Sequence, residues 1–124
     1  MWKNIECIFC KIIKGEIPSY TIYEDDVVKV FLDVNPDNNG HTLIVPKKHY
    51  LDLYDIPLDV LSHINKVSKE IAKLLTCKLH ADGITLVQNN GLLQAIKHYH
   101  LHLIPKYKNE EKINVEKIYS ILKD

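Results

Sequence analysis

The chain has 124 residues, a common size for one domain and enough to bury a single core. Lys and Arg together number 16, as do Asp and Glu, so the formal net charge is zero and the pI is near 7.0. This balance excludes a global field that draws a protein to nucleic acid or to an anionic membrane, and we expect neither partner.

The sequence also predicts a cytoplasmic location. No apolar run approaches the roughly 18 residues that a membrane span needs. The first residues, MWKNIECIFCK, lack the long apolar core of a secretory signal. We expect one domain over residues 1–124, with a core at 7–105 and a tail at 106–124.

Cysteine usage comes first in chain order. Cys7 and Cys10 have CxxC spacing, which in a small cytosolic protein favours metal or redox chemistry over a structural disulfide. A thioredoxin-like role is the weaker alternative, because the chain before Cys7 is too short to supply the strand that precedes such a motif. We interpret the distant Cys77 as a small buried apolar residue without a function.

The first half of the chain reads as a helix followed by strands. Gly15 and Pro18 end the helix, and the acidic segment 24–26 joins the first two strands as a hairpin. The turn-forming run 35–40 precedes a third strand, which Pro46 ends. The predicted ranges are a helix at 8–13 and strands at 21–23, 27–32 and 41–45.

The second half contains the longest periodic pattern. Apolar residues at 61, 64, 67, 71, 74 and 75 predict one long helix from Pro57 to about Cys77. Strands are predicted at 84–88 and 97–104, with a turn or binding loop at 89–91 and a short amphipathic helix near 113–122. The elements predict an α+β fold: an antiparallel sheet of about five strands, the long helix on one face, and a short N-terminal helix.

His98, His100 and His102 occupy every second position and are the strongest functional signal. Such spacing on an extended chain places all three imidazoles on one face and the intervening apolar residues on the other. Imidazole is suited to proton transfer, nucleophilic attack and metal ligation near neutral pH. A zinc-binding His-x-His pair is the rival interpretation of the same spacing.

Several segments, taken in order, resemble the histidine triad (HIT) family of nucleotidyl hydrolases and transferases, which act at an α-phosphate. The resemblance covers Cys7 to about Pro105 and looks most like a bacterial-type branch with an N-terminal CxxC zinc motif. The matching segments are CIFCKIIKGEIPS, YEDD, FLDVNP, GHTLIVPKKH, VQNNG and QAIKHYHLHLIPK.

The resemblance implies a role for each matching residue. His100 aligns with the family's nucleophile, and His98, His102 and His41 align with the histidines around it. Neutral imidazole can attack phosphorus to form a nucleotidyl-histidine intermediate. The resemblance further assigns phosphate contacts to Asn89 and Gln94, the ribose to Asp33, and an apolar slot for a purine base to Ile8, Phe9, Ile12, Phe31 and Val34.

The resemblance also implies a structural zinc ion. In family members with a CxxC motif, the two cysteines pair with the histidine of the PKxH segment and with the first triad histidine. The ligands here are Cys7, Cys10, His49 and His98. A closed four-ligand set suits a structural ion and weakens the idea of catalytic zinc, which needs an open position.

The sequence departs from the family pattern beside the triad. Only Leu92 and Leu93 separate Gly91 from Gln94, where relatives usually carry a longer loop, and Ala95 replaces a frequent hydroxyl residue. The leaving-group side of the site is therefore expected to differ.

The resemblance predicts a homodimeric hydrolase of purine nucleoside phosphoramidates, adenylates or dinucleoside polyphosphates that releases AMP or GMP. Two alternatives remain open from the sequence. One is a nucleotide-binding adaptor with little turnover, and the other is a metal-dependent hydrolase.

Overall fold

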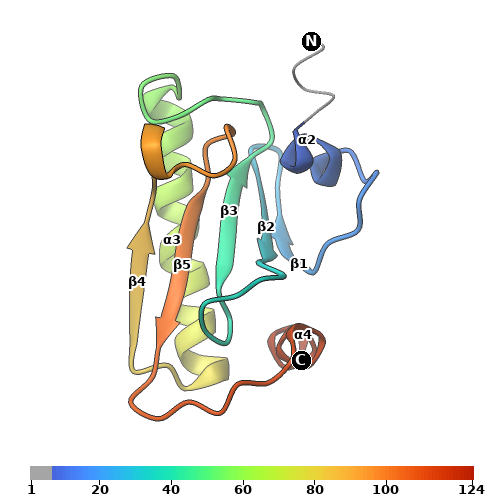
Figure 1. Ribbon diagram of the computed structural model, residues 1–124, viewed down its shortest axis with the longest axis vertical. Helices are drawn as coiled ribbons and strands as arrows, with labels where there is room; N and C mark the ends of the chain where they lie inside the picture. Colours follow the sequence, from blue (N-terminus) through green and yellow to red (C-terminus); the bar gives the residue numbers. More distant parts are fainter. Residues whose placement is uncertain (1–6) are drawn as a thin grey trace.

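A computed structural model describes residues 7–124 (Figure 1). These residues contain one sheet in the order β1-β2-β3-β5-β4, with every neighbouring pair antiparallel. The predicted α+β class, with a five-stranded sheet, a long helix and a short N-terminal helix, is confirmed. The elements are α2 (Ile8–Ile13), β1 (Thr21–Glu24), β2 (Val28–Leu32), β3 (Thr42–Pro46), α3 (Leu58–Leu79), β4 (Gly83–Val87), the 3-10 turn η1 (Gly91–Leu93), β5 (Leu101–Lys106) and α4 (Val115–Lys123).

Helix α3 covers one face of the sheet, as its apolar periodicity predicts (Figure 1). Its residues Ile64, Ile71 and Leu75 are buried in one core with Leu101 and Leu103 of β5. Burial of such side chains contributes about 1.5–3 kcal/mol each relative to exposure. The face that packs on α3 is therefore fixed by apolar residues, and the opposite face of β5 carries His102.

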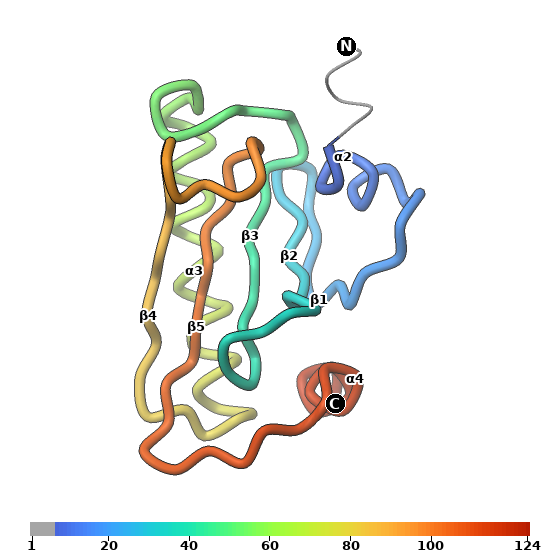
Figure 2. The backbone as a smooth tube through the Cα atoms, in the orientation of Figure 1, coloured from blue at the N-terminus to red at the C-terminus, as the bar shows by residue number. Residues whose placement is uncertain are grey.

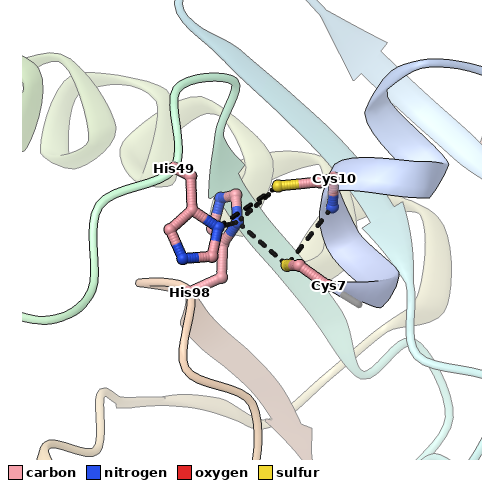
Figure 3. Close-up of side chains that lie close together, drawn as sticks. All are labelled: Cys7, Cys10, His49 and His98. Atoms are coloured by element: carbon pink, nitrogen blue, oxygen red, sulfur yellow. Dashed lines mark hydrogen bonds between the residues drawn. The ribbon is translucent and has the colours of Figure 1, made fainter. Parts of the chain in front are cut away.

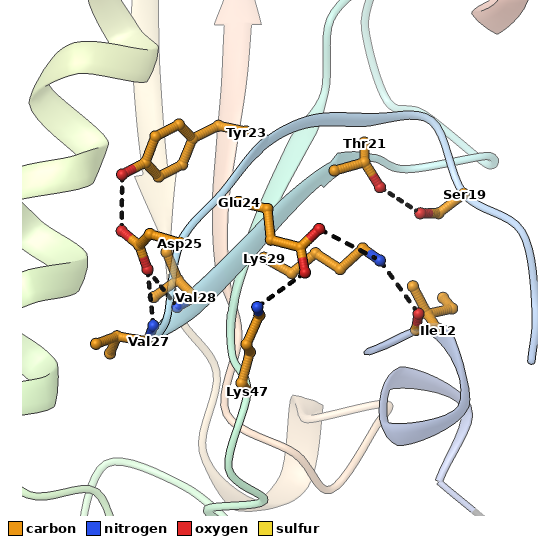
Figure 4. A network of polar contacts seen from close by, with 10 residues as sticks. All are labelled: Ile12, Ser19, Thr21, Tyr23, Glu24, Asp25, Val27, Val28, Lys29 and Lys47. Carbon is orange, nitrogen blue, oxygen red and sulfur yellow. Dashed lines mark hydrogen bonds and ion pairs between the residues drawn. The ribbon is translucent and has the colours of Figure 1, made fainter. Parts of the chain in front are cut away.

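Helix α2 packs against the opposite face of the sheet through a second, smaller core. Phe9 meets Phe31 of β2 edge to face, with ring centroids 5.7 Å apart. Lys29 of β2 donates to the carbonyl oxygen of Ile12 at 3.3 Å and pairs with Glu24 of β1 at 3.8 Å (Figure 4). These contacts hold the cysteine-bearing helix against the sheet.

The histidine strand is displaced relative to its predicted range of 97–104. β5 runs from Leu101 to Lys106, so His98 and His100 lie in the segment before it. Pro105 does not end the strand, because pairing with β3 stops at Leu103 and its missing N–H costs no bond on that side. The alternation predicted for this segment persists nonetheless, with Tyr99 and Leu101 in the α3 core.

Cys77 is exposed, so its interpretation as a buried residue is wrong. It follows the fully buried Leu75 by two residues and therefore points about 200° around the helix axis from it.

Within residues 7–124, no helix is long and apolar enough to cross a membrane. The prediction about a secretory signal falls largely on residues 1–6, which lie outside the described residues.

The turn between β1 and β2 is organised by one carboxylate (Figure 4). Asp25 Oδ1 accepts hydrogen bonds from the amides of Val27 and Val28, both at 2.8 Å. Its Oδ2 lies 2.7 Å from the Tyr23 hydroxyl and 2.7 Å from His63 Nε2 on α3. Burial alone would raise the pKa of Asp25, but these hydrogen bonds together hold it well below its usual range.

We expect Asp25→Asn to lower the free energy of unfolding by about 2 kcal/mol at pH 6, a typical scale for hydrogen bonds to a charged group. Because the folded pKa lies below the unfolded value of about 3.9, this stabilisation is present above pH 4 and is lost as pH falls toward the folded pKa. In denaturant titrations, the difference in the free energy of unfolding between wild type and variant should be smaller at pH 2.5 than at pH 6. The exposed neighbour Asp26 provides the control Asp26→Asn, and an equal loss in both variants would contradict the assignment.

Candidate functional site

The triad histidines meet helix α2 on the face of the sheet opposite α3. The Phe9 ring lies edge to face with His100 at a centroid distance of 5.0 Å and with His98 at 5.8 Å. The rings of His100 and His102 are 4.8 Å apart. His98 and His100 are buried, so each needs hydrogen-bond partners within the protein.

His100 receives its orientation from the backbone. Its Nδ1 lies 2.8 Å from the carbonyl oxygen of His98, and a carbonyl can only accept. The proton of neutral His100 therefore resides on Nδ1, and Nε2 keeps its lone pair. This tautomer has an available nitrogen nucleophile or ligand atom at Nε2.

His102 receives the opposite tautomer through a neighbouring histidine. The amide of Asp37 donates to His41 Nδ1 at 3.1 Å, which places the proton of neutral His41 on Nε2. His41 Nε2 lies 2.9 Å from His102 Nδ1 and donates to it. His102 Nδ1 is thus an acceptor, and the proton of neutral His102 resides on Nε2.

The imidazoles are held neutral at physiological pH. Burial lowers the pKa of His41 and of His100, and it lowers the pKa of His98 and of His102 to about 4. The neighbouring imidazoles add to this effect at His102. The tautomers deduced from the hydrogen bonds therefore apply at pH 7, with one nitrogen acceptor on His100 and one nitrogen donor on His102.

A cavity of about 390 Å³ opens beside these two rings. His100 and His102 line it together with every residue predicted for the base and ribose: Ile8, Phe9, Ile12, Phe31, Val34 and Asp33. Ile8 and Val34 are 45% and 64% exposed, although both are apolar. Exposed apolar walls around a few polar groups are typical of a small-molecule site.

Asp33 carries the carboxylate in this cavity. Its Oδ1 accepts from the amide of Asn35 at 2.9 Å, and its Oδ2 lies 3.7 Å from His41 Nε2. The local turn fixes the carboxylate at the end of β2. Each oxygen retains lone-pair capacity for a ligand hydroxyl group.

Gln94 and Asn89 are not among the residues that line this cavity. The short 91–94 segment forms the turn η1, which leaves Leu92 98% exposed. Buried Gln94 instead donates from Nε2 to the carbonyl oxygen of Leu51 at 2.7 Å. Gln94 Nε2 carries two hydrogens, so this bond does not exclude a phosphate contact, and the predicted roles of Gln94 and Asn89 stay predictions.

The four predicted zinc ligands come together between α2 and the start of β5 (Figure 3). His98 Nδ1 lies 3.4 Å from Cys7 Sγ and 3.6 Å from Cys10 Sγ. His49 Nδ1 lies 3.2 Å from Cys10 Sγ and 3.1 Å from His98 Nδ1. A tetrahedral zinc ion requires about 3.6 Å between sulfur and nitrogen and about 3.4 Å between nitrogens, so this donor set fits zinc.

The surroundings of the cluster also suit a metal. His98 Nε2 lies 2.8 Å from the carbonyl oxygen of Pro46 and donates to it, which leaves the Nδ1 lone pair directed at the two thiols. Burial, followed by the contact with Cys7, raises the pKa of the Cys10 thiol to about 11. A bound zinc ion would displace this proton, since the thiolate is the ligand form.

Asp33, His41 and His102 form a second group of potential ligands. Its hydrogen bonds do not suit a metal ion. The Asp37 amide donates to His41 Nδ1, so the proton of neutral His41 resides on Nε2, the atom that faces the group. A metal at Nε2 would move the proton to Nδ1, directly against the amide hydrogen. This group is therefore better explained by hydrogen bonding than by metal binding.

Comparison with known proteins identifies the family of the chain. A model of the HIT domain matches residues 14–109. The chain belongs to the histidine triad (HIT) family. It is 48% identical over 109 residues to an uncharacterised HIT-like protein of Methanocaldococcus jannaschii, covering 86% of this chain and 84% of that protein.

Two further HIT relatives are informative. An adenosine 5'-monophosphoramidase of Candida albicans is 44% identical over 112 residues, covering 86% of this chain and 74% of the enzyme. A zinc-bound histidine triad family protein from Mycobacterium smegmatis superposes with a TM-score of 0.89 at 33% identity. That superposition covers 97% of this chain and 92% of the other.

Sequence reasoning missed several residues of the cavity wall. Ile17, Pro18 and Ser19 line the cavity, although the sequence marks this stretch only as the end of a helix. Ile96 lines it as well, from the segment before the triad. The available signal was an apolar residue at 17 among polar, turn-forming residues, whereas Ile96 lies in the partly apolar stretch GLLQAIK and carries no such signal. Whether such residues line a cavity depends on which distant segments they meet in the folded chain.

Proposed function

We propose that this HIT protein hydrolyses purine nucleoside phosphoramidates, adenylates or dinucleoside polyphosphates at the α-phosphate, releasing AMP or GMP. The observation that carries the proposal is the pair of opposite tautomers at one cavity. His100 offers a lone pair at Nε2, and His102 offers a proton at Nε2. The identity to adenosine 5'-monophosphoramidases supports the substrate class.

In the proposed first step, His100 Nε2 forms a bond to the α-phosphorus and the bond to the leaving nitrogen or oxygen breaks. The leaving atom takes the electron pair and one proton from solvent. The His100 ring becomes cationic in this step, and the His98 carbonyl oxygen at 2.8 Å from Nδ1 stabilises that charge.

In the second step, water attacks the same phosphorus and the bond to His100 breaks, with its electron pair returning to Nε2. The water loses one proton, which balances the proton taken up by the leaving group. In both steps His102 Nε2–H donates to a phosphoryl oxygen, and His41 keeps that proton in place by occupying His102 Nδ1.

The cavity supports a nucleoside as the bound group. Phe9, Phe31 and the aliphatic residues Ile8, Ile12 and Val34 offer apolar surface to a purine base. The Asp33 carboxylate offers acceptors for the ribose hydroxyls at the same wall. The phosphate contacts of Asn89 and Gln94 belong to the proposal only on the strength of the family resemblance.

The proposed zinc ion at Cys7, Cys10, His49 and His98 is structural. It would join α2 to the segment before β5 with four protein ligands, and zinc supplies folding free energy at such a site. Its two cysteine ligands flank Phe9 in the sequence, so the ion would also fix the ring that contacts His100. The zinc-bound relative supports the assignment.

A homodimer in the cytoplasm completes the proposal. β4 lies at one edge of the sheet, and its residue Leu86 is exposed, as are Leu92 and Leu93 of the η1 turn. An exposed strand edge with apolar side chains is suited to pairing with a second copy. None of the three cysteines forms a disulfide, which supports a reducing compartment.

The adaptor alternative is favoured by one observation, the short η1 turn, after which Gln94 is buried and outside the lining of the cavity. A substrate such as an adenosine phosphoramidate separates the two, since an adaptor would bind AMP with hardly any turnover. Chelator treatment distinguishes a metal-dependent hydrolase from the proposed histidine mechanism, because only the metal-dependent hydrolase requires zinc in the chemical step itself.

We expect His100→Ala to reduce turnover of an adenosine phosphoramidate by several orders of magnitude, because the proposed nucleophile is removed. AMP affinity should stay within about tenfold, since base and ribose contacts lie elsewhere. Steady-state kinetics and calorimetric titration measure the two quantities. His80→Asn, at the exposed end of α3, is the matched histidine control, and a His100 variant with a tenth of the wild-type rate would refute the nucleophile.

Replacing a proposed metal ligand should act on stability. Cys10→Ser should lose bound zinc and lower the thermal midpoint more than it alters the chemical step, because structural zinc contributes folding free energy. Metal analysis by mass spectrometry and thermal denaturation test this, with Cys77→Ser at the exposed cysteine as the control. Absence of zinc from carefully purified wild-type protein would contradict the zinc assignment. A Cys7–Cys10 disulfide would then be the preferred interpretation.

The ribose contact can be tested with two ligands. Asp33→Ala should weaken AMP binding by about 2–3 kcal/mol, the scale for hydrogen bonds to a charged acceptor. The same substitution should cost 2'-deoxy-AMP much less, because that ligand lacks one of the two hydroxyls. Calorimetric titration of both ligands measures the difference, and equal losses would show that Asp33 does not contact the 2'-hydroxyl.

A further inference from the structure

The segment that follows β5 forms hydrogen bonds to the loop that precedes His41. Figure 2 shows this segment running from the end of β5 to α4, past the loop between β2 and β3. Most of the contacts converge on a single residue, Asn39. The family match ends at residue 109, so much of this segment lies beyond it.

Every polar group of Asn39 is bonded to this segment. Its amide donates to Glu110 Oε2 at 2.6 Å, and its Nδ2 donates to the carbonyl oxygen of Glu111 at 2.9 Å. Its carbonyl oxygen accepts from the Tyr107 hydroxyl at 2.6 Å, and its Oδ1 accepts from the amide of Ile113 at 3.2 Å. A residue with all four groups committed is held in one position.

The same loop determines the tautomer of His41. The peptide unit between Asn38 and Asn39 bonds to Glu110 through its N–H and accepts the His41 amide at its carbonyl oxygen, at 3.1 Å. Lys112 Nζ donates to the carbonyl oxygen of Asp37 at 2.9 Å. The Asp37 amide is the donor to His41 Nδ1, so bonds from the tail and bonds to His41 alternate along this loop.

We propose that Asn39 and Glu110 are positioning residues for the His41–His102 pair, and that the segment 107–113 works as a brace for this catalytic loop. The inference rests on the proposed function, because the brace matters for turnover only if His102 acts on a phosphate. Glu110 acts by fixing the peptide unit whose carbonyl oxygen holds His41. Its carboxylate makes the bond a strong, charge-assisted one.

The neighbouring glutamate offers a matched control. Glu110 and Glu111 are adjacent and carry the same charge, but Glu111 contributes only its backbone oxygen to Asn39. We expect Glu110→Ala to lower kcat about tenfold with KM within twofold, and Glu111→Ala to leave both within twofold. Glu110→Gln keeps an acceptor oxygen and should restore most of kcat. Tyr107→Phe, which removes the second bond to Asn39, should lower kcat in the same direction.

A second measurement is independent of turnover. The ring nitrogen shifts of His41 and His102 in the full-length protein report which nitrogen carries the proton. In wild type and Glu111→Ala we expect one tautomer for each ring, with His102 Nδ1 unprotonated. In Glu110→Ala we expect mixed or exchange-broadened tautomers, while amide spectra show that the protein is folded.

The two readouts distinguish the failures. If the wild type turns over no substrate but the tautomers of Glu110→Ala are mixed, the proposed function fails and the brace stands. If Glu110→Ala keeps the wild-type tautomers, or an active enzyme keeps kcat within twofold on this substitution, the brace is overturned.

Discussion

Hydrogen bonds from the backbone to imidazole rings are the constraint on which this site depends. A neutral imidazole has one donor and one acceptor nitrogen, so a single fixed partner decides the chemistry of the other atom. The His98 carbonyl oxygen makes His100 Nε2 an acceptor, and the Asp37 amide, through His41, makes His102 Nε2 a donor. Burial keeps these rings neutral, so their tautomers are not lost to protonation at pH 7.

The same logic separates two groups of metal-capable residues. At the Cys7–Cys10 cluster, the Pro46 carbonyl oxygen takes the outer proton of His98 and leaves the inner nitrogen free for a metal. At the Asp33 group, an amide donor occupies the outer nitrogen of His41 and forces the proton inward. Donor atoms lie close together in both places, but only one has the outer bonds that a ligand histidine requires.

The fold places these hydrogen-bonding groups because it has two cores, one on each face of the sheet. The core under α3 takes Tyr99, Leu101 and Leu103, so the histidines that alternate with them face the other side of the sheet. Helix α2 then contributes both Phe9 beside the His100 ring and the cysteines beside His98. The cavity beside His100 and the cysteine–histidine cluster thus share one short helix, and loosening of α2 would affect both.

The sequence by itself determined the α+β class, the order of the elements and the apolar slot beside the triad. Periods of 2 and 3.6 residues are local properties, and the quoted motifs occur in a fixed order. The tertiary structure alone decided that His98 and His100 lie before β5, that Cys77 is exposed and that Gln94 turns to Leu51. It also decided the tautomers and the hold of Glu110 on Asn39, because these depend on partners far away in sequence, brought into contact only when the chain has folded.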